Sequence, residues 1–338
     1  MHTTLKRLAS LNATVAVVLS AGLTLRASAQ QEPVRGVTTA SGVVQRAQLL
    51  LQRQQRDSAT TLLSMHVAVE PTDGRAWFFL GRIYLENARE WHRAGHPPEV
   101  SGGSVFVDMA GSSFEPAQEL LTDSGGVFRV VAAMEQATLR IEASGWEALA
   151  SWKPASEELP LPPVMAELGR NLLASCPKNG VLVTGTSVVE AAAVWGIRLQ
   201  GDRDDLVVIR PDMYQWDRRY RGRMAAAIGA DSASELAPAL AAAARSRPIC
   251  LGPSVDSIAL PGLQWSRSWL VLSTAATVVP AAQFSVFRLS RTGLTGSVWT
   301  AAARDEYDLA ARRNHALCST LFVTSYSSTA PAIPACSP

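Results

Sequence analysis

After residue 163, short apolar runs alternate with segments of helical periodicity, and this alternation constrains the fold more than any other feature. The apolar runs cover 181–184, 204–212, 247–252 and 265–274, and the helical patterns cover 164–175, 188–199, 217–228, 232–245 and 301–321. Short strands that alternate with helices are typical of βα units and a parallel sheet. We therefore predict a mostly parallel three-layer α/β domain over residues 164–325.

The residues that precede this domain carry helical periodicity. Two sets recur at helical spacing: Ala59, Leu63 and Pro71, followed by Trp77, Leu80, Gly81 and Tyr84. This succession resembles the tetratricopeptide repeat, which has a period of about 34 residues. The small Gly81 stands where two helices of such a repeat would pack closely.

Helical patterning resumes at 104–122 and 126–150, after a Gly/Pro-rich break. At least ~3 repeats are needed to bury a continuous core, so we expect these helices to pack against the α/β domain. The sequence thus predicts an all-α, TPR-like helical domain over 30–152. A proline-rich linker over 153–163 and a Ser/Pro-rich tail over 326–338 complete the predicted organisation.

The first 29 residues have the pattern of a secretory signal peptide. Lys6 and Arg7 precede an apolar run from Ala13 to Leu25, and Ala27-Ser28-Ala29 forms a cleavage motif. The run is shorter than the ~20 residues that span a bilayer, which favours cleavage over a retained anchor. We expect a periplasmic protein, soluble or held at the periplasmic face of the inner membrane.

Removal of this segment would change the formal net charge of the chain from +2 to −1, because it holds three basic and no acidic residues. A near-neutral chain has no general attraction to nucleic acid. The four cysteines permit three disulfide connectivities in an oxidising compartment, and we favour Cys318 with Cys336. Their spacing supports no redox, haem or structural zinc site.

Part of the predicted α/β domain resembles a known family. The shared positions are Lys178-Asn179-Gly180 before the first strand, Trp195 in the helix, and Gly201, Arg203 and Asp205 before the second strand. They resemble the soluble C-terminal region of bacterial protein O-mannosyltransferase-like membrane proteins. That family has an acidic turn where this chain has Gly185 to Val188, and its membrane-spanning part is missing here. The resemblance therefore implies a fold and does not carry glycosyl transfer.

Two segments are candidate ligand sites. Thr184, Thr186 and Ser187 follow the first strand and precede a helix, where free N–H groups can bind an anion. The alternative that we favour is a helix cap by Thr186 or Ser187. Arg218, Arg219 and Arg221 lie beside aromatic residues and would bind a carboxylate or phosphate, or would form an ordinary polar helix face.

His92 and His96 lie four residues apart and would share a metal ion on a continuous helix. Gly95 and Pro97 indicate that the helix ends there, so we interpret the two histidines as an exposed pair at its end. No catalytic set, metal site or cofactor motif is predicted.

These features favour a non-enzymatic exported scaffold that binds another periplasmic or membrane-embedded protein, such as a respiratory or photosynthetic membrane complex. The candidate interaction residues are aromatic: Trp77, Tyr84, Trp91, Trp216 and Tyr220. The alternatives are a binding module for a sugar or an anionic envelope ligand, and a hydrolase or transferase. A perturbed carboxyl group beside Ser187 or His315 would favour the enzyme.

Overall fold

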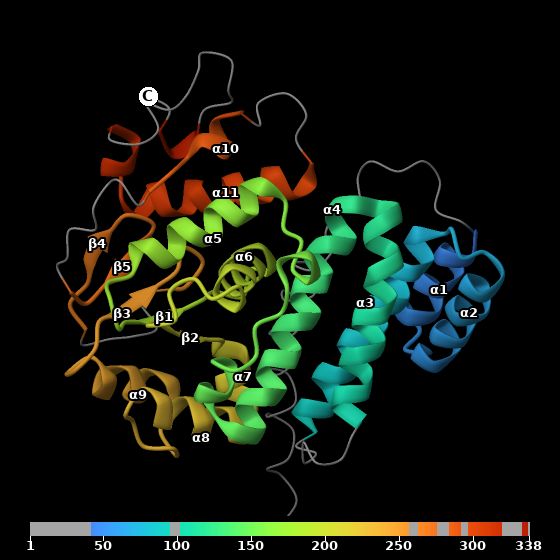
Figure 1. The fold of residues 1–338 in the computed structure, drawn as a ribbon, viewed down its shortest axis with the longest axis horizontal. Coiled ribbons are helices and arrows are strands. Elements are labelled where there is room, and N and C mark those ends of the chain that lie inside the picture. Colours follow the sequence, from blue (N-terminus) through green and yellow to red (C-terminus); the bar gives the residue numbers. More distant parts are fainter. Residues whose placement is uncertain are drawn as a thin grey trace, which may run out of the picture. The chain divides into compact units, whose positions relative to one another are not determined.

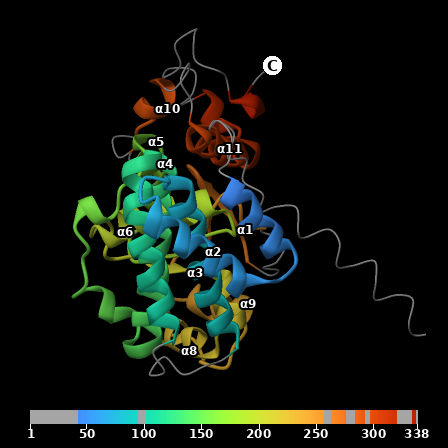
Figure 2. The same ribbon diagram turned by 90° about the vertical axis from the view of Figure 1, so that its right-hand side faces the viewer.

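The computed structural model of the protein describes residues 42–94, 102–256, 263–275, 284–291, 297–319 and 333–336 (Figures 1 and 2). All of these residues belong to one unit, which covers Thr39–Pro338. The predicted signal segment and most of the predicted tail lie outside the described residues.

The helical part begins with three helices: α1 (Gly42–Gln52), α2 (Arg56–Val69) and α3 (Gly74–Arg93). Asp73 caps α3, because its Oδ1 accepts hydrogen bonds from the backbone N–H groups of Arg75 and Ala76 at 3.1 and 3.0 Å. Gly81 lies directly against the Phe114 ring, and a Cβ atom there would be 2.6 Å from a ring carbon. The close packing expected at Gly81 is therefore observed.

Helix α4 (Gly102–Ser144) folds back on itself. The Gln136 side chain donates a hydrogen bond to Asp108 at 3.1 Å, although the two residues are 28 apart in sequence. A straight helix would separate them by about 42 Å. The bend brings Gly125 against the backbone of Gln118, where a Cβ atom would lie 2.2 Å from the Gln118 nitrogen. The two arms agree with the two helices predicted at 104–122 and 126–150 (Figure 1).

The rest of the described chain alternates short helices and strands. The elements are η1 (Trp146–Leu149), η2 (Ser156–Glu158), α5 (Pro163–Ser175), β1 (Val181–Val183), α6 (Val188–Leu199), β2 (Val207–Ile209), α7 (Pro211–Trp216), α8 (Arg218–Ala227), α9 (Leu236–Ala243), β3 (Ile249–Leu251), β4 (Ser266–Ser268), β5 (Val271–Ser273), α10 (Phe287–Arg291), α11 (Val298–Arg313) and η6 (Pro334–Cys336). A helical part and an α/β part are thus both present.

The strands form one mixed sheet in the order β2-β1-β3-β5-β4. Strand β1 pairs in parallel with β2 and β3, whereas β5 pairs antiparallel with β3 and β4. The predicted mostly parallel sheet is therefore not observed. The segment predicted as one strand at 265–274 is a hairpin, in which Trp269 turns the chain at a φ of 49°. Tryptophan is not a usual turn residue, so the turn left no sequence signal.

The second arm of α4 packs against α6 and α8. Phe128 on α4 contacts Trp299 on α11, with ring centroids 6.2 Å apart, and Gly196 on α6 lets Val130 approach closely. The helices that cannot bury a core alone therefore bury it against the α/β part, as expected. The division into domains at 153–163 stays a prediction.

Asn179, Arg203 and Asp205, three of the positions compared above, are joined by hydrogen bonds. The guanidinium of Arg203 donates hydrogen bonds to the carbonyls of Leu173 and Cys176 at 2.6 and 3.0 Å, and pairs with Asp205. Asp205 in turn accepts from the backbone N–H of Asn179 at 2.8 Å. The hydrogen bonds from Arg203 lower the pKa of Asp205 to about 2. These positions hold the turn between α5 and β1 against the start of β2.

Two disulfides close the α/β part. Cys176, at the end of α5, pairs with Cys250 in β3, with Cα atoms 5.8 Å apart. Cys318 pairs with Cys336, with Cα atoms 5.3 Å apart, which is the pairing favoured from the sequence. Among the described helices, none combines the length and the apolarity that crossing a membrane requires.

Candidate functional site

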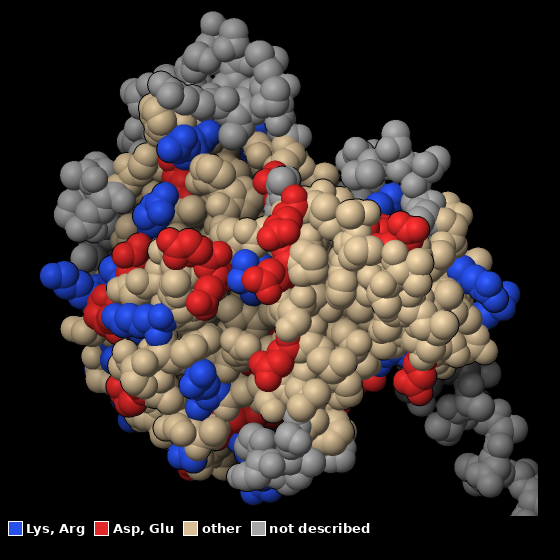
Figure 3. Space-filling view, turned by 45° about the vertical axis from the view of Figure 1, so that its right-hand side comes forward, with Lys and Arg blue, Asp and Glu red and all other residues tan. Residues whose placement is uncertain are grey.

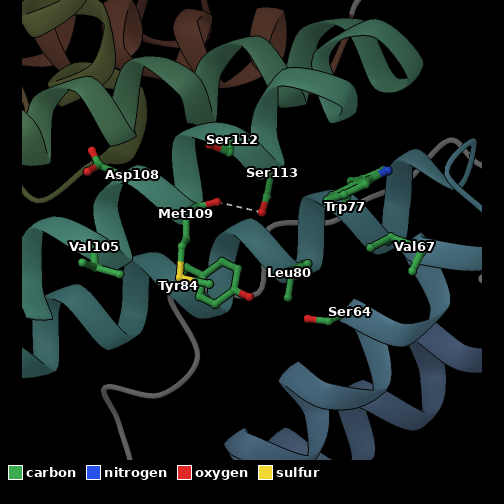
Figure 4. Close-up of a pocket in the computed structure, with 11 residues that line it drawn as sticks. Ser64, Val67, Trp77, Leu80, Tyr84, Val105, Asp108, Met109, Ser112 and Ser113 are labelled. Carbon is green, nitrogen blue, oxygen red and sulfur yellow. Dashed lines mark hydrogen bonds between the residues drawn. The ribbon is translucent and has the colours of Figure 1, made fainter.

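An apolar groove of about 540 Å³ lies between α2, α3 and the first arm of α4 (Figure 4). Side chains from all three helices line it: Ser64, Val67, Ala68, Trp77, Leu80, Tyr84, Val105, Asp108, Met109, Ser112 and Ser113. The floor is fixed, since Leu80 and Tyr84 are buried and the Trp77 indole donates a hydrogen bond to the Pro71 carbonyl at 2.9 Å. The rim is apolar and open, since Val105 is 47% exposed.

Two of the five predicted interaction residues, Trp77 and Tyr84, line the groove. Trp91 packs instead on Phe106, with ring centroids 6.5 Å apart. Trp216 is 51% exposed and lies on the α/β part, where the Arg93 guanidinium stacks over its ring at 4.7 Å. The prediction for Tyr220 is wrong, because its side chain is fully buried and its hydroxyl accepts a hydrogen bond from the backbone N–H of Arg210.

The turn after β1 is occupied by a carboxylate of the chain itself. Glu190 is fully buried and accepts hydrogen bonds from the backbone N–H of Gly185 at 2.8 Å and from the N–H and hydroxyl of Ser254 at 3.0 and 2.5 Å. The Ser187 hydroxyl caps α6 by accepting from the Glu190 N–H at 3.3 Å. Thr184 is buried and its hydroxyl bonds to the Ile209 carbonyl, whereas Thr186 is exposed. The turn is therefore a capped helix start whose anion position Glu190 fills.

A second carboxyl group, Glu306 on α11, lies beside this turn. Burial, and then the negative charge of Glu190, raise the pKa of Glu306 to about 8, against an opposing hydrogen bond from Ser187. Its Oε2 atom is buried and has no hydrogen-bond partner among the described residues. A perturbed carboxyl beside Ser187 is the feature that favours a hydrolase or transferase. The three hydrogen bonds to Glu190, however, are those of a structural group that joins two loops.

A polar pocket of about 450 Å³ lies at the start of α8, beside the end of α4. It is lined by Glu142, Ala143, Arg218, Arg219, Gly222, Arg223, Ala226 and Ser232. Arg218 and Arg219 were predicted as ligand residues and meet here. Arg221 points elsewhere and donates to the Tyr214 and Gln215 carbonyls at 2.9 and 2.6 Å. No hydrogen bond or ion pair of the described residues joins these arginines to Thr184, Thr186 or Ser187.

Glu142, which lines this pocket, also belongs to a buried ionic cluster with His92 and Asp217. His92 is only 5% exposed, and its Nδ1 lies 3.2 Å from Glu142 Oε1 and 3.8 Å from Asp217 Oδ2. Burial lowers the pKa of His92, but Asp217 and Glu142 outweigh this effect and raise it to about 9. The prediction of an exposed His92 is wrong, because α4 and α8 cover the end of α3. His96 lies outside the described residues.

A second group of buried charged side chains lies near this cluster. Glu135 is fully buried between Arg210, at 2.7 Å, and Arg89, at 3.0 Å. The attraction of these two guanidinium groups overcomes burial and lowers the pKa of Glu135 to about 2. The Thr138 hydroxyl lies 3.1 Å from Arg210 and completes the network. Nothing in the sequence around Glu135 or Glu142 distinguishes them from ordinary helix-face glutamates, so neither was predicted.

Comparisons with protein-family models, with curated proteins and with solved structures gave no match for this chain.

Proposed function

We propose that the protein is an exported, non-enzymatic interaction subunit whose helical part binds an apolar segment of a partner protein. The observation that supports this most is the groove between α2, α3 and α4, because it joins a fixed aromatic floor to an exposed apolar rim. Such grooves bind amphipathic helices, which insert apolar anchors spaced along one face.

The distribution of exposed apolar side chains favours this side of the molecule. Of the nine large apolar residues that are exposed in the described part, six lie on α1, α2 and α4: Leu49, Met65, Val69, Val105, Met109 and Leu120. Figure 3 shows few charged side chains over the helical side, on the right, and many over the α/β side. Exposed apolar surface that is concentrated on one side marks an interaction site.

The one charged residue of the groove indicates what charge its occupant should carry. Asp108 is the only charged residue among those that line it, and its side chain is exposed. The expected occupant is therefore an amphipathic helix that carries a basic residue at the edge of its apolar face. A subunit at the periplasmic face of a respiratory or photosynthetic membrane complex is the partner that fits an exported chain.

The test is co-purification from native membranes in mild detergent. Replacing Val105 and Met109 by Asp would place two charges on the apolar rim, and we expect recovery of the partner to fall at least about tenfold. Leu309→Asp, at an exposed apolar position on α11, is the matched control and should retain the partner. Loss of the partner in the control alone, or retention in both variants, would refute the groove as the binding site.

A second candidate function is the binding of an anionic envelope ligand in the pocket that Arg218, Arg219 and Arg223 share. Arg223 donates to the carbonyls of Glu142 and Ala143, so Arg218 and Arg219 are the candidate ligand residues. Guanidinium groups suit carboxylate or phosphate. With a sugar phosphate as the probe in calorimetry, we expect the native chain to bind and the Arg218→Ala/Arg219→Ala variant to bind at least about tenfold more weakly. Arg245→Ala, an exposed arginine outside the pocket, should bind like the native chain.

A further inference from the structure

Three side chains from separate elements bring metal-ligand atoms together. His92 comes from the last turn of α3, Glu142 from the second arm of α4, and Asp217 from the N-cap of α8. Their donor atoms all lie within 4.8 Å of one another, and all three residues are buried. Imidazole and carboxylate groups in this combination suit divalent transition metals such as zinc.

The distance between His92 and Glu142 is compatible with coordination of one metal ion. His92 Nδ1 and Glu142 Oε1 are 3.2 Å apart, yet Glu142 Oε1 has no hydrogen-bond partner among the described residues. Two ligands on a tetrahedral zinc ion, with bonds of about 2.0–2.1 Å, are separated by about 3.3 Å. The carboxylate oxygen and the imidazole nitrogen are therefore separated by about the distance between two ligands of one tetrahedral ion.

Asp217 is oriented for the same point. Its Oδ1 accepts hydrogen bonds from the backbone N–H groups of Arg219 and Tyr220, both at 2.7 Å. This cap fixes the carboxylate plane and leaves Oδ2 directed at His92, 3.8 Å away. The third ligand atom is thus positioned by the helix start and not by the histidine.

The cluster holds two carboxylates and one imidazole. Glu142 and Asp217 both face His92, and no ion pair of the described residues joins this group to the neighbouring one. In the neighbouring group, Arg89 and Arg210 are paired with Glu135 and Asp212. A cation between Glu142 and Asp217 would compensate buried negative charge locally.

We propose that His92 Nδ1, Glu142 and Asp217 bind one divalent transition-metal ion of the zinc class. Glu142 also lines the arginine pocket, so the proposed site lies beside that pocket. Structural zinc sites are usually closed by four protein ligands, whereas three protein ligands leave a position for exchange.

The chain contains a matched control for this site. Asp73 caps α3 through Oδ1, as Asp217 caps α8, and its Oδ2 lies 2.9 Å from His66 Nε2. This pair has the same cap and the same kind of histidine contact, and no metal-ligand cluster of the described residues includes it. Asp73→Asn therefore changes the same chemistry at a position where no tight metal site is expected.

The experiment is a Zn²⁺ titration of the full chain, stripped with a chelator, in competition with a chromophoric zinc indicator. We expect one tight site per chain in the native protein and in Asp73→Asn. Asp217→Asn keeps the capping oxygen and replaces Oδ2 by an amide nitrogen, so it should weaken Zn²⁺ binding at least roughly 100-fold. Glu142→Gln should weaken Zn²⁺ binding to a similar extent. It replaces Asp217→Asn in the experiment if that variant does not fold. Circular dichroism checks the folding of each variant.

X-ray absorption of the zinc-loaded chain gives an independent readout, with one imidazole and two carboxylates expected in the first shell. Absence of a tight site in the native chain would overturn the proposal and leave a protonated His92 as the account of the cluster. Tight binding that both Asp217→Asn and Glu142→Gln retain would overturn it as well, because the ion would then lie elsewhere.

Discussion

At the residue scale, Glu306 is a buried carboxyl group whose environment differs from that of a solvated side chain. Its pKa is raised to about 8, so the folded chain retains a proton that the unfolded chain releases near pH 4.5. The unfolded state therefore gains relative stability as pH rises from about 4.5 to 8. A neutral side chain of the same shape would avoid this loss.

We predict that Glu306→Gln matches the native chain in stability near pH 4.5 and exceeds it by roughly 2–4 kcal/mol at pH 8, since one pKa unit corresponds to about 1.4 kcal/mol. Urea unfolding of both proteins across this pH range measures the difference. Glu119→Gln, an exposed change on α4, should show no such trend. A difference between Glu306→Gln and the native chain that does not vary with pH would mean that Glu306 is ionised in the folded state.

At the element scale, the local pattern determines which segments become helices and strands but not what covers them. Helix α6 begins and ends where the periodicity predicted, at Val188 and Leu199, because its cap and its apolar face are both local. The β4–β5 hairpin was missed, because Trp269 adopts a positive φ that no residue preference announces. Propensity is overridden there by the pairing of β5 with β3.

The candidate site residues also differ in whether the local sequence could predict them. Trp77 and Tyr84 were predicted together because helical spacing places them on one face. His92 was predicted to be exposed because Gly95 and Pro97 indicate that the helix ends there. Its side chain is instead buried against Glu142 and Asp217, which come from distant segments of the chain. A contact between segments far apart in the chain has no local signature, so neither the ionic cluster nor the Glu190–Glu306 pair could be predicted from one sequence.

At the scale of the whole molecule, the helical and α/β parts are joined by buried charge. Arg210 follows β2, and its guanidinium bonds to Glu135 on α4 at 2.7 and 3.2 Å. Both side chains are at least 96% buried, at 4% and 0% exposure. Removing one member of such a pair leaves the other buried without its counter-charge, which costs several kcal/mol.

We predict that Glu135→Gln lowers the free energy of unfolding of the chain by about 3 kcal/mol, because Arg210 and Arg89 both lose their shared carboxylate. The Glu135→Leu/Arg210→Met variant should recover most of this loss, since an apolar pair of similar volume needs no counter-charge. Since the pair couples the two parts, the native chain should unfold in one transition by tryptophan fluorescence and by far-ultraviolet circular dichroism. Two separate transitions in the native chain would show instead that the segments on either side of 153–163 are independent domains.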